Sequence, residues 1–244
     1  MSGSKRLLIT SAIVALLAVA LTTGRAGEQG SQGNSNPRIF APDSEPYGKS
    51  YSEWEGAFWK WALELPLAGH PFNDDSPNYD FSAHQSGRVW FWSAPEEVFT
   101  RTSTMPEGVA IFLTTLDAEC STLEDPPFHG DTEAEQRMCA EFFAGHIEDV
   151  FVIIDGVEVK NAADYRVSGT QVRFTAPTPW IFGDVGGPGT SVGDGYYFMI
   201  KPLKAGHHTI EYGGRFHFDA GELGNTDPFD IVKDVTIELT VVKG

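Results

Sequence analysis

The sequence predicts a mainly β fold, an antiparallel β-sandwich of the jelly-roll or immunoglobulin-like kind. Many short apolar or alternating runs are separated by turns rich in glycine and proline, which is typical of antiparallel strands. The sequence does not show the strand–helix–strand alternation that would indicate a parallel α/β sheet. The 244 residues are 41% hydrophobic and 12% aromatic, so the chain can bury the core that such a sandwich needs.

Strand signals recur along the chain. Asp155-Gly156 lies between two apolar runs and predicts a tight hairpin, because that turn needs positive φ at both central residues. The stretch Pro177–Gly193 holds three prolines and five glycines and predicts a long loop. The predicted strands are Arg88–Ser93, Gly108–Leu116, Val150–Ile154, Val157–Lys160, Gln171–Ala176, Gly195–Leu203, His207–Tyr212 and Asp234–Val242.

A tryptophan-rich helix is expected near the start of the domain. Ser52 and Glu55 fit a capping box, which predicts a helix from about Glu53 to Glu64, and Pro66 ends it. Its predicted apolar face consists of Trp54, Phe58, Trp61, Ala62 and Leu65, with Trp59 nearer the flank.

A second, short helix and a disulfide are expected in one insertion. Asp131 can cap a helix from about Thr132 to Gly145, with an apolar stripe of Ala134, Met138 and Phe142. Cys120 and Cys139 are the only cysteines. In an oxidising compartment an even pair predicts one disulfide, worth about 3 kcal/mol in the chain-entropy picture, with two free thiols as the alternative.

Residues 1–26 read as a secretory signal peptide. Lys5 and Arg6 precede an apolar stretch from Leu7 to Leu21, and small residues precede a cut after Ala26. The stretch is short for a membrane span, so an uncleaved anchor is the alternative. A flexible leader, 27–46, and a single domain, 47–244, are expected to follow. We therefore expect a secreted, cell-surface or periplasmic protein without stable membrane insertion after cleavage.

The net charge of −17 argues against nucleic acid as a partner, because phosphate binding needs a basic face. It is compatible with a solvated acidic surface, with calcium binding or with a cationic partner.

Several sequence blocks carry a resemblance. They are Tyr47–Leu63, Gln85–Phe91, Met105–Phe112, Asp117–Cys120, Asp194–Tyr197 and Gly206–Ile210. In order and spacing they resemble an uncharacterised family of secreted bacterial and archaeal proteins. The resemblance implies one secreted domain and assigns no activity.

Carboxylates and tryptophans supply the candidate sites. Asp117 and Glu119 lie two apart on one strand face, and with Asp194 they are candidates for acid–base catalysis of the kind that glycosidases use. No cofactor is expected, with one alternative: on an Asp- and Asn-rich loop, Asp74, Asp75 and Asp80 are candidate ligands for calcium. Asx-turns are the alternative use of that loop.

The tryptophans Trp92, Trp180 and Trp59 are candidate ligand-binding platforms, and we expect Trp92 and Trp180 to be the most exposed. The sequence therefore favours a non-enzymatic binding module for a glycan or another extracellular ligand. An extracellular polysaccharide hydrolase and a structural envelope protein are the alternatives.

Overall fold

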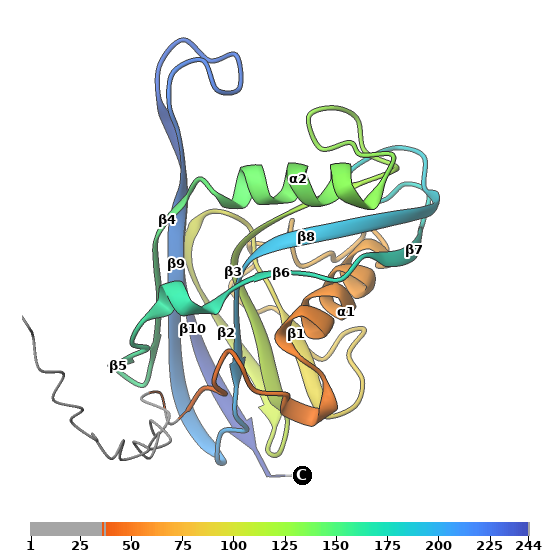
Figure 1. The fold of residues 1–244 in the computed structure, drawn as a ribbon. Helices are drawn as coiled ribbons and strands as arrows, with labels where there is room; N and C mark the ends of the chain where they lie inside the picture. Colours follow the sequence, from red (N-terminus) through yellow and green to blue (C-terminus); the bar gives the residue numbers. More distant parts are fainter. Residues whose placement is uncertain (1–35, 37, 244) are drawn as a thin grey trace, which may run out of the picture. The chain divides into compact units, whose positions relative to one another are not determined.

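The computed structural model describes Asn36 and residues 38–243, which belong to one compact unit. Two five-stranded sheets form this unit (Figure 1). One cluster of buried apolar side chains includes residues from both sheets, as the predicted β-sandwich requires. The predicted signal peptide, 1–26, lies outside the described residues.

The first sheet has the strand order β1-β3-β8-β6, and β7 also pairs with β8. Its strands are β1 (Val89–Trp92), β3 (Ala110–Ser121), β6 (Arg166–Ser168), β7 (Val172–Ala176) and β8 (Gly187–Ile200). β8 begins inside the predicted loop Pro177–Gly193, which is therefore shorter than expected. The glycines of this segment pair with β7 instead of forming a loop.

The second sheet has the order β2-β10-β9-β4-β5. Its strands are β2 (Val98–Pro106), β4 (Ile147–Ile154), β5 (Val157–Glu158), β9 (Gly206–Phe218) and β10 (Phe229–Val242). The predicted turn at Asp155-Gly156 joins β4 to β5, and both residues have positive φ, 50° and 72°.

The sheets are not purely antiparallel. β1 runs parallel to β3, and β2 runs parallel to β10 over nine residue pairs. A parallel pair needs a crossover connection instead of a tight turn. β10 is inserted between β2 and β9, so the last described strand joins elements that are far apart in the sequence.

Helix α1 (Tyr51–Leu63) is the predicted tryptophan-rich helix. Its capping box is Ser50 with Glu53, two residues earlier than the predicted pair of Ser52 with Glu55. Both pairs fit the same motif. Glu55 and Trp59 are buried, while Trp54 and Trp61 are only partly buried, so the buried face differs from the predicted one. Short 3₁₀ turns occupy Pro46–Gly48 and Ala162–Tyr165.

Helix α2 (Glu133–Ala144) is capped by Thr132, and the predicted disulfide Cys120–Cys139 is present. The predicted stripe is wrong, because Met138 is 67% exposed and Phe142 is also exposed. The disulfide turns the side of Ala140 and Phe143 toward β3 and β8 instead.

The expected flexible leader, 27–46, is folded over its described part. Ile39 is fully buried and forms a bridge with Ile200, and the Phe40 amide donates to the Met199 carbonyl at 3.0 Å. Ile39 and Phe40 thus pair with the edge of β8 at the end of that strand, so the folded unit starts earlier than Tyr47.

Candidate functional site

A pocket of about 420 Å³ opens beside the second half of β3. β1 pairs with β3 only as far as Leu113, and Pro95, which has no amide proton, follows soon after β1 ends. Asp117 and Glu119 thus have no strand neighbour on that side within the described part of the chain. The segment Ser93–Glu96, the end of α2 and the β9–β10 hairpin surround the opening.

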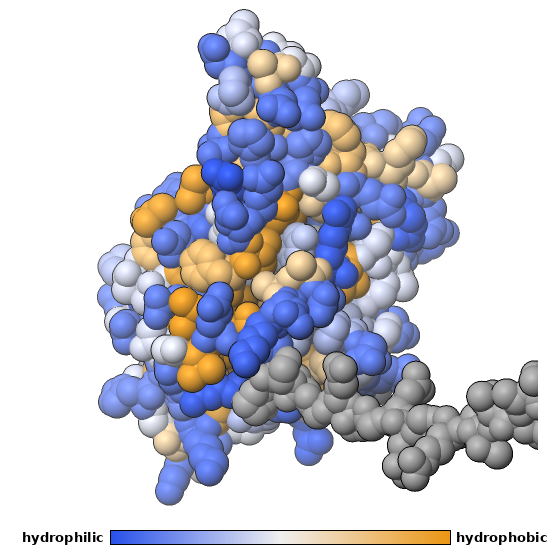
Figure 2. Space-filling model, turned by 60° about the vertical axis from the view of Figure 1, so that its left-hand side comes forward, coloured by the Kyte–Doolittle hydropathy of each residue, from blue (hydrophilic) through white to orange (hydrophobic). Residues whose placement is uncertain are grey.

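The pocket walls are mainly apolar. Figure 2 shows hydrophobic side chains gathered around a recess on the face that carries the hairpin. Phe182 is 41% exposed, so the aromatic lining reaches the solvent. The apolar lining residues are Trp59, Phe72, Phe128, Phe143, Ile181, Phe182, Phe216, Phe218, Leu223 and Ile231.

A β-bulge aims the acids of β3 at this space. The register shifts between Thr114 and Asp117, after which Asp117 pairs with Gly195 and Glu119 with Gly193. A Cβ on Gly195 would lie 2.4 Å from Asp117 Cβ, and one on Gly193 only 2.1 Å from Glu55 Oε1. Glycine on β8 therefore makes the room in which these carboxyl groups lie.

The hydroxyl of Tyr197 connects two of the acids. It donates to Asp117 Oδ2 at 3.0 Å, accepts from Trp59 Nε1 at 3.1 Å and lies 3.4 Å from Glu55 Oε1. Burial, together with the nearby charge of Asp117, raises the pKa of Glu55 well above its ordinary value. A protonated Glu55 can donate to Tyr197, and this arrangement uses the single hydroxyl proton and both lone pairs.

The carboxyl group of Asp117 holds its proton more tightly than usual. Burial raises its pKa to about 7, and the charge of Lys233 and the Tyr197 hydrogen bond only partly oppose the increase. Near neutral pH, Asp117 can therefore both give and take a proton, which is the property expected of a functional acid in a pocket.

Glu119 and Glu124 form a second buried acid pair. The Ser191 hydroxyl bonds to Glu119 Oε2, and the Ser121 hydroxyl donates to Glu124 Oε2 at 3.0 Å. Burial raises the pKa of both carboxyl groups, and for Glu124 the charge of Glu119 adds to the increase. Glu119 Oε1 has no hydrogen-bond donor among the described groups. Glu124 can supply one only when it is protonated, so the pair retains a proton.

Among the residues that the structure describes, Lys233 is the one cation in the pocket wall. Its inward position on β10 follows from the alternation of Lys233, Val235 and Ile237, which are buried while their neighbours are more exposed. Sequence reasoning missed Lys233 and also Glu55, Glu96 and Glu124. A lysine at an inward position of an alternating strand was the available signal for Lys233.

Asp194 does not join the other predicted acids. It pairs with Ala118, so its side chain lies on the opposite sheet face from Asp117 and Glu119. There it forms an ion pair with Arg166 at 2.8 Å, next to the charges of α2. The predicted catalytic set is thus divided by the sheet.

The predicted tryptophan platforms are not at the surface. Trp92 is fully buried and stacks on Phe81 at 4.1 Å, and Trp180 is only 2% exposed. Trp92 faces the core because its strand is covered on both sides. Trp59, 4% exposed, lines the pocket, but its indole nitrogen is used by Tyr197.

The acidic loop does not gather its oxygens. Asp74 Oδ1 accepts from the Ser76 amide at 2.8 Å, and Asp80 Oδ1 accepts from the Ser82 amide at 2.9 Å. Both are Asx-turns. Within the described residues, no group of three or more His, Cys, Asp or Glu side chains, and thus none that includes Asp75, could hold a metal ion.

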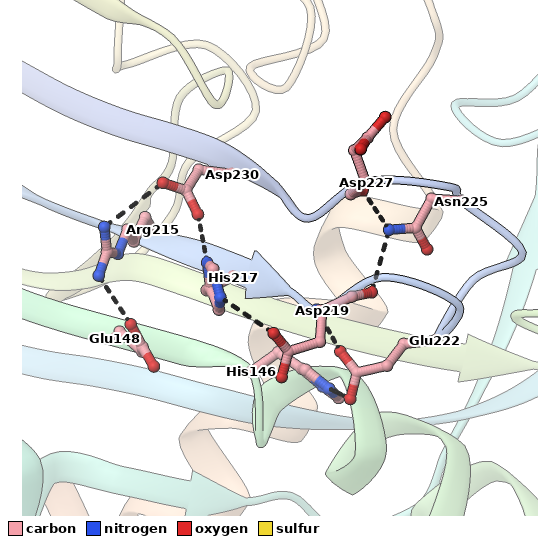
Figure 3. Close-up of polar contacts among 9 residues, drawn as sticks. All are labelled: His146, Glu148, Arg215, His217, Asp219, Glu222, Asn225, Asp227 and Asp230. Atoms are coloured by element: carbon pink, nitrogen blue, oxygen red, sulfur yellow. Dashed lines mark hydrogen bonds and ion pairs between the residues drawn. The ribbon is translucent and has the colours of Figure 1, made fainter.

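A polar network fastens the hairpin that forms one pocket wall (Figure 3). His217 Nδ1 lies 2.6 Å from Asp230 Oδ1 across the hairpin, and His146 Nε2 lies 3.0 Å from Glu222 Oε1. Arg215 forms ion pairs with Asp230 and with Glu148 of β4. These contacts tie the hairpin to β4 and to the turn after α2, and so position Phe216 and Phe218.

No helix of the described residues is long and apolar enough to cross a bilayer. No protein-family profile, curated protein or solved structure matches this chain.

Proposed function

We propose that this is a secreted ligand-binding protein that holds an amphiphilic small molecule in the pocket beside β3. The observation that carries the proposal is the pairing of aromatic walls with buried carboxyl groups in a cavity of about 420 Å³. Cavities of this size, largely apolar with a few convergent polar groups, are the usual form of small-molecule sites.

The polar end of the ligand should donate hydrogen bonds. Asp117, Glu119 and Glu124 face the pocket together with Glu96, against the single cation of Lys233. Carboxylates accept hydrogen bonds, and a buried acceptor without a donor costs about 1–3 kcal/mol. An amine or hydroxyl head would supply donors, whereas a carboxylate head would meet like charge.

A glycan would also present a hydroxyl-rich head to this pocket. It would then contact the pocket walls and not the tryptophan platforms that the sequence predicted. Trp92 and Trp180 are buried, so a sugar would enter the pocket instead of stacking on exposed indoles. Export from the cytoplasm is part of the proposal. The charged start followed by the apolar stretch 7–21 and the disulfide support it.

Displacement of a fluorescent apolar dye tests the binding function. Nonylamine, nonanol and nonanoic acid would be compared as competitors, with a soluble oligosaccharide as a fourth. We expect the amine and alcohol to displace the dye at lower concentration than the acid. Phe182→Ala should weaken dye binding, and Val185→Ala, on the same loop but outside the pocket lining, should not. No displacement by any competitor would refute the proposal.

A hydrolase is the second candidate, because Asp117, with its pKa of about 7, lies in the same pocket as Glu119. Release of sugar from a polysaccharide panel would be measured for the wild type and for Asp117→Asn. Release that Asp117→Asn abolishes would establish the enzyme. If no ligand binds and no sugar is released, a structural role in the cell envelope is favoured.

A further inference from the structure

The amine of Lys233 has different surroundings from those of the other described lysines, because its side chain is buried. The side chain is 2% exposed and lines the pocket. Within the described residues, its Nζ has no hydrogen bond and no ion pair, and it lies over the ring of Tyr212, whose centroid is 6.0 Å away. Lys60, by comparison, pairs with Glu64 and donates to the Arg173 carbonyl.

Burial without a partner disfavours the charged ammonium. Desolvation lowers the pKa of Lys233. The charges of Glu96 and Asp117 oppose this change, and the nearby cation of Arg101 adds a smaller effect in the lowering direction. Arg101 is itself 1% exposed, and its Nε and Nη1 have no partner in the described part of the chain. A neutral lysine amine is a nucleophile, and desolvation next to a second cation is a recognised way to produce one.

An acid that can work with this amine lines the same pocket. Asp117 and Lys233 interact electrostatically, and Asp117 shares the pocket wall with it. Tyr197 holds the Asp117 carboxyl group in place through the 3.0 Å hydrogen bond to Oδ2. An apolar pocket that holds both a free amine and a proton donor has the components of carbonyl chemistry.

We infer that Lys233 Nζ forms a reversible imine with the carbonyl carbon of an amphiphilic aldehyde or ketone held in the pocket. This inference rests on the proposed small-molecule binding and adds a second ligand class to the hydrogen-bond donors: a carbonyl head on an apolar body, whose oxygen accepts a hydrogen bond from the protonated carboxyl group of Asp117. The apolar walls hold the body, and the carbonyl carbon meets the amine of β10.

The step balances without a further reagent. The nitrogen lone pair forms the C–N bond as the π bond of the carbonyl breaks, and one proton passes from nitrogen to oxygen, which gives a carbinolamine. The C–O bond then breaks as Asp117 protonates the departing hydroxyl, so that water leaves. The second nitrogen proton returns to the Asp117 carboxylate. Amine and aldehyde thus give imine and water.

Reductive trapping tests the inference on the full chain. The protein would be incubated with nonanal and cyanoborohydride at pH 7, and the modified lysines would be located by peptide mass spectrometry. We expect labelling to concentrate on Lys233, at about tenfold over exposed lysines for each unit by which its pKa lies below theirs. Asp117→Asn should slow labelling on the order of 10²-fold, as loss of a general acid does.

Two variants and one competitor make the test specific. Lys233→Arg should lose the dominant adduct, whereas Lys204→Arg, at an exposed lysine, should keep it. Nonanol should protect Lys233 in the wild type, which keeps the test decisive even if Lys233→Arg fails to fold.

The outcomes separate the two proposals. If nonanal displaces the dye but labelling falls on the exposed lysines and not on Lys233, the imine is refuted and the binding function stands. If nonanal does not displace the dye and Lys233 is not labelled, the imine is refuted. The binding function fails as well only if the amine, the alcohol and the oligosaccharide also leave the dye in place.

Discussion

Tyr197 donates a hydrogen bond of 3.0 Å to Asp117, and this bond links the interior of the first sheet to the pocket. Tyr197 comes from β8 and is fully buried, stacked on Phe112 with ring centroids 5.4 Å apart. It cannot follow Asp117 if that residue moves, so the position of the carboxyl group is set by the core.

Removal of this hydroxyl should raise the pKa of Asp117 further, because the hydrogen bond lowers it. Tyr197→Phe should also cost about 1–3 kcal/mol, since Trp59 Nε1 and Glu55 lose their partner. Infrared titration of the carboxyl band and urea unfolding would measure the two effects. An unchanged Asp117 titration would contradict the link. Tyr196→Phe, at the neighbouring half-buried tyrosine, is the control.

Stability should fall as the pH rises from about 4 to about 7. The folded-state pKa of Asp117 is about 7, above the value of about 3.9 in an unfolded chain. Its contribution is therefore fully present below pH 4 and is lost as the pH approaches 7, at about 1.4 kcal/mol for each unit between the two values as an upper bound. Asp117→Asn should flatten this part of the curve.

The measurement is the free energy of unfolding in urea at a series of pH values. Asp184→Asn, at an exposed position, serves as the matched control and should reproduce the wild-type slope. The same slope in Asp117→Asn would show that Asp117 is not the buried acid responsible.

The base of the β9–β10 hairpin should loosen at alkaline pH. The hydrogen bond to Asp230 raises the pKa of His217, so its contribution is complete below about pH 6.5 and is lost as the pH rises through the raised value. His217 in turn lowers the pKa of Asp230, so the contribution of Asp230 is lost at acid pH. Hydrogen exchange of the hairpin amides, measured over a range of pH, would report both losses of stability.

His217→Gln should remove the alkaline change in exchange and leave β3 amides unaffected. His84→Asn, on an exposed loop at positive φ, should behave as the wild type, because asparagine tolerates that backbone. A wild-type alkaline change that persists in His217→Gln would exclude this histidine as its origin.

The Cys120–Cys139 disulfide should support the pocket as well as the fold. Replacement of both cysteines by alanine is expected to cost about 2–5 kcal/mol. It should also weaken dye binding, because α2 carries Phe143 into the pocket wall and the bridge fixes α2 to β3. Thermal unfolding and dye titration, with Met138→Ala on the exposed side of α2 as control, would measure both. Equal dye affinity would refute the second part.

The sequence predicted the elements that depend on local chemistry. The Asp155-Gly156 turn, the disulfide and the existence of both helices are confirmed. Their signals lie within a few residues of one another. The capping box was misplaced by two residues because Ser50 and Ser52 fit the motif equally well. Trp59 is buried because packing of the helix against the first sheet selects its buried face, which the capping motif does not encode.

Strand β2 was missed because its buried positions are Arg101, Ser103 and Met105, of which only Met105 is apolar. Its partner is β10, more than a hundred residues away, so no nearby sequence carries the pairing. Asp117 and Glu119 were identified as candidates from their spacing. Glu55, Glu124 and Lys233 join them only through tertiary packing, which a local pattern does not encode.

The place of β10 between β2 and β9 has a consequence for the order of folding. β2 has no partner strand until residues 234–242 arrive, so a chain that emerges from its amino-terminal end leaves β2 unpaired throughout synthesis or passage across a membrane. Lys233 arrives with the same strand, so the pocket acquires its amine in the final step. Such non-local pairing favours slow folding, and the second sheet is completed only when the last described strand has been made.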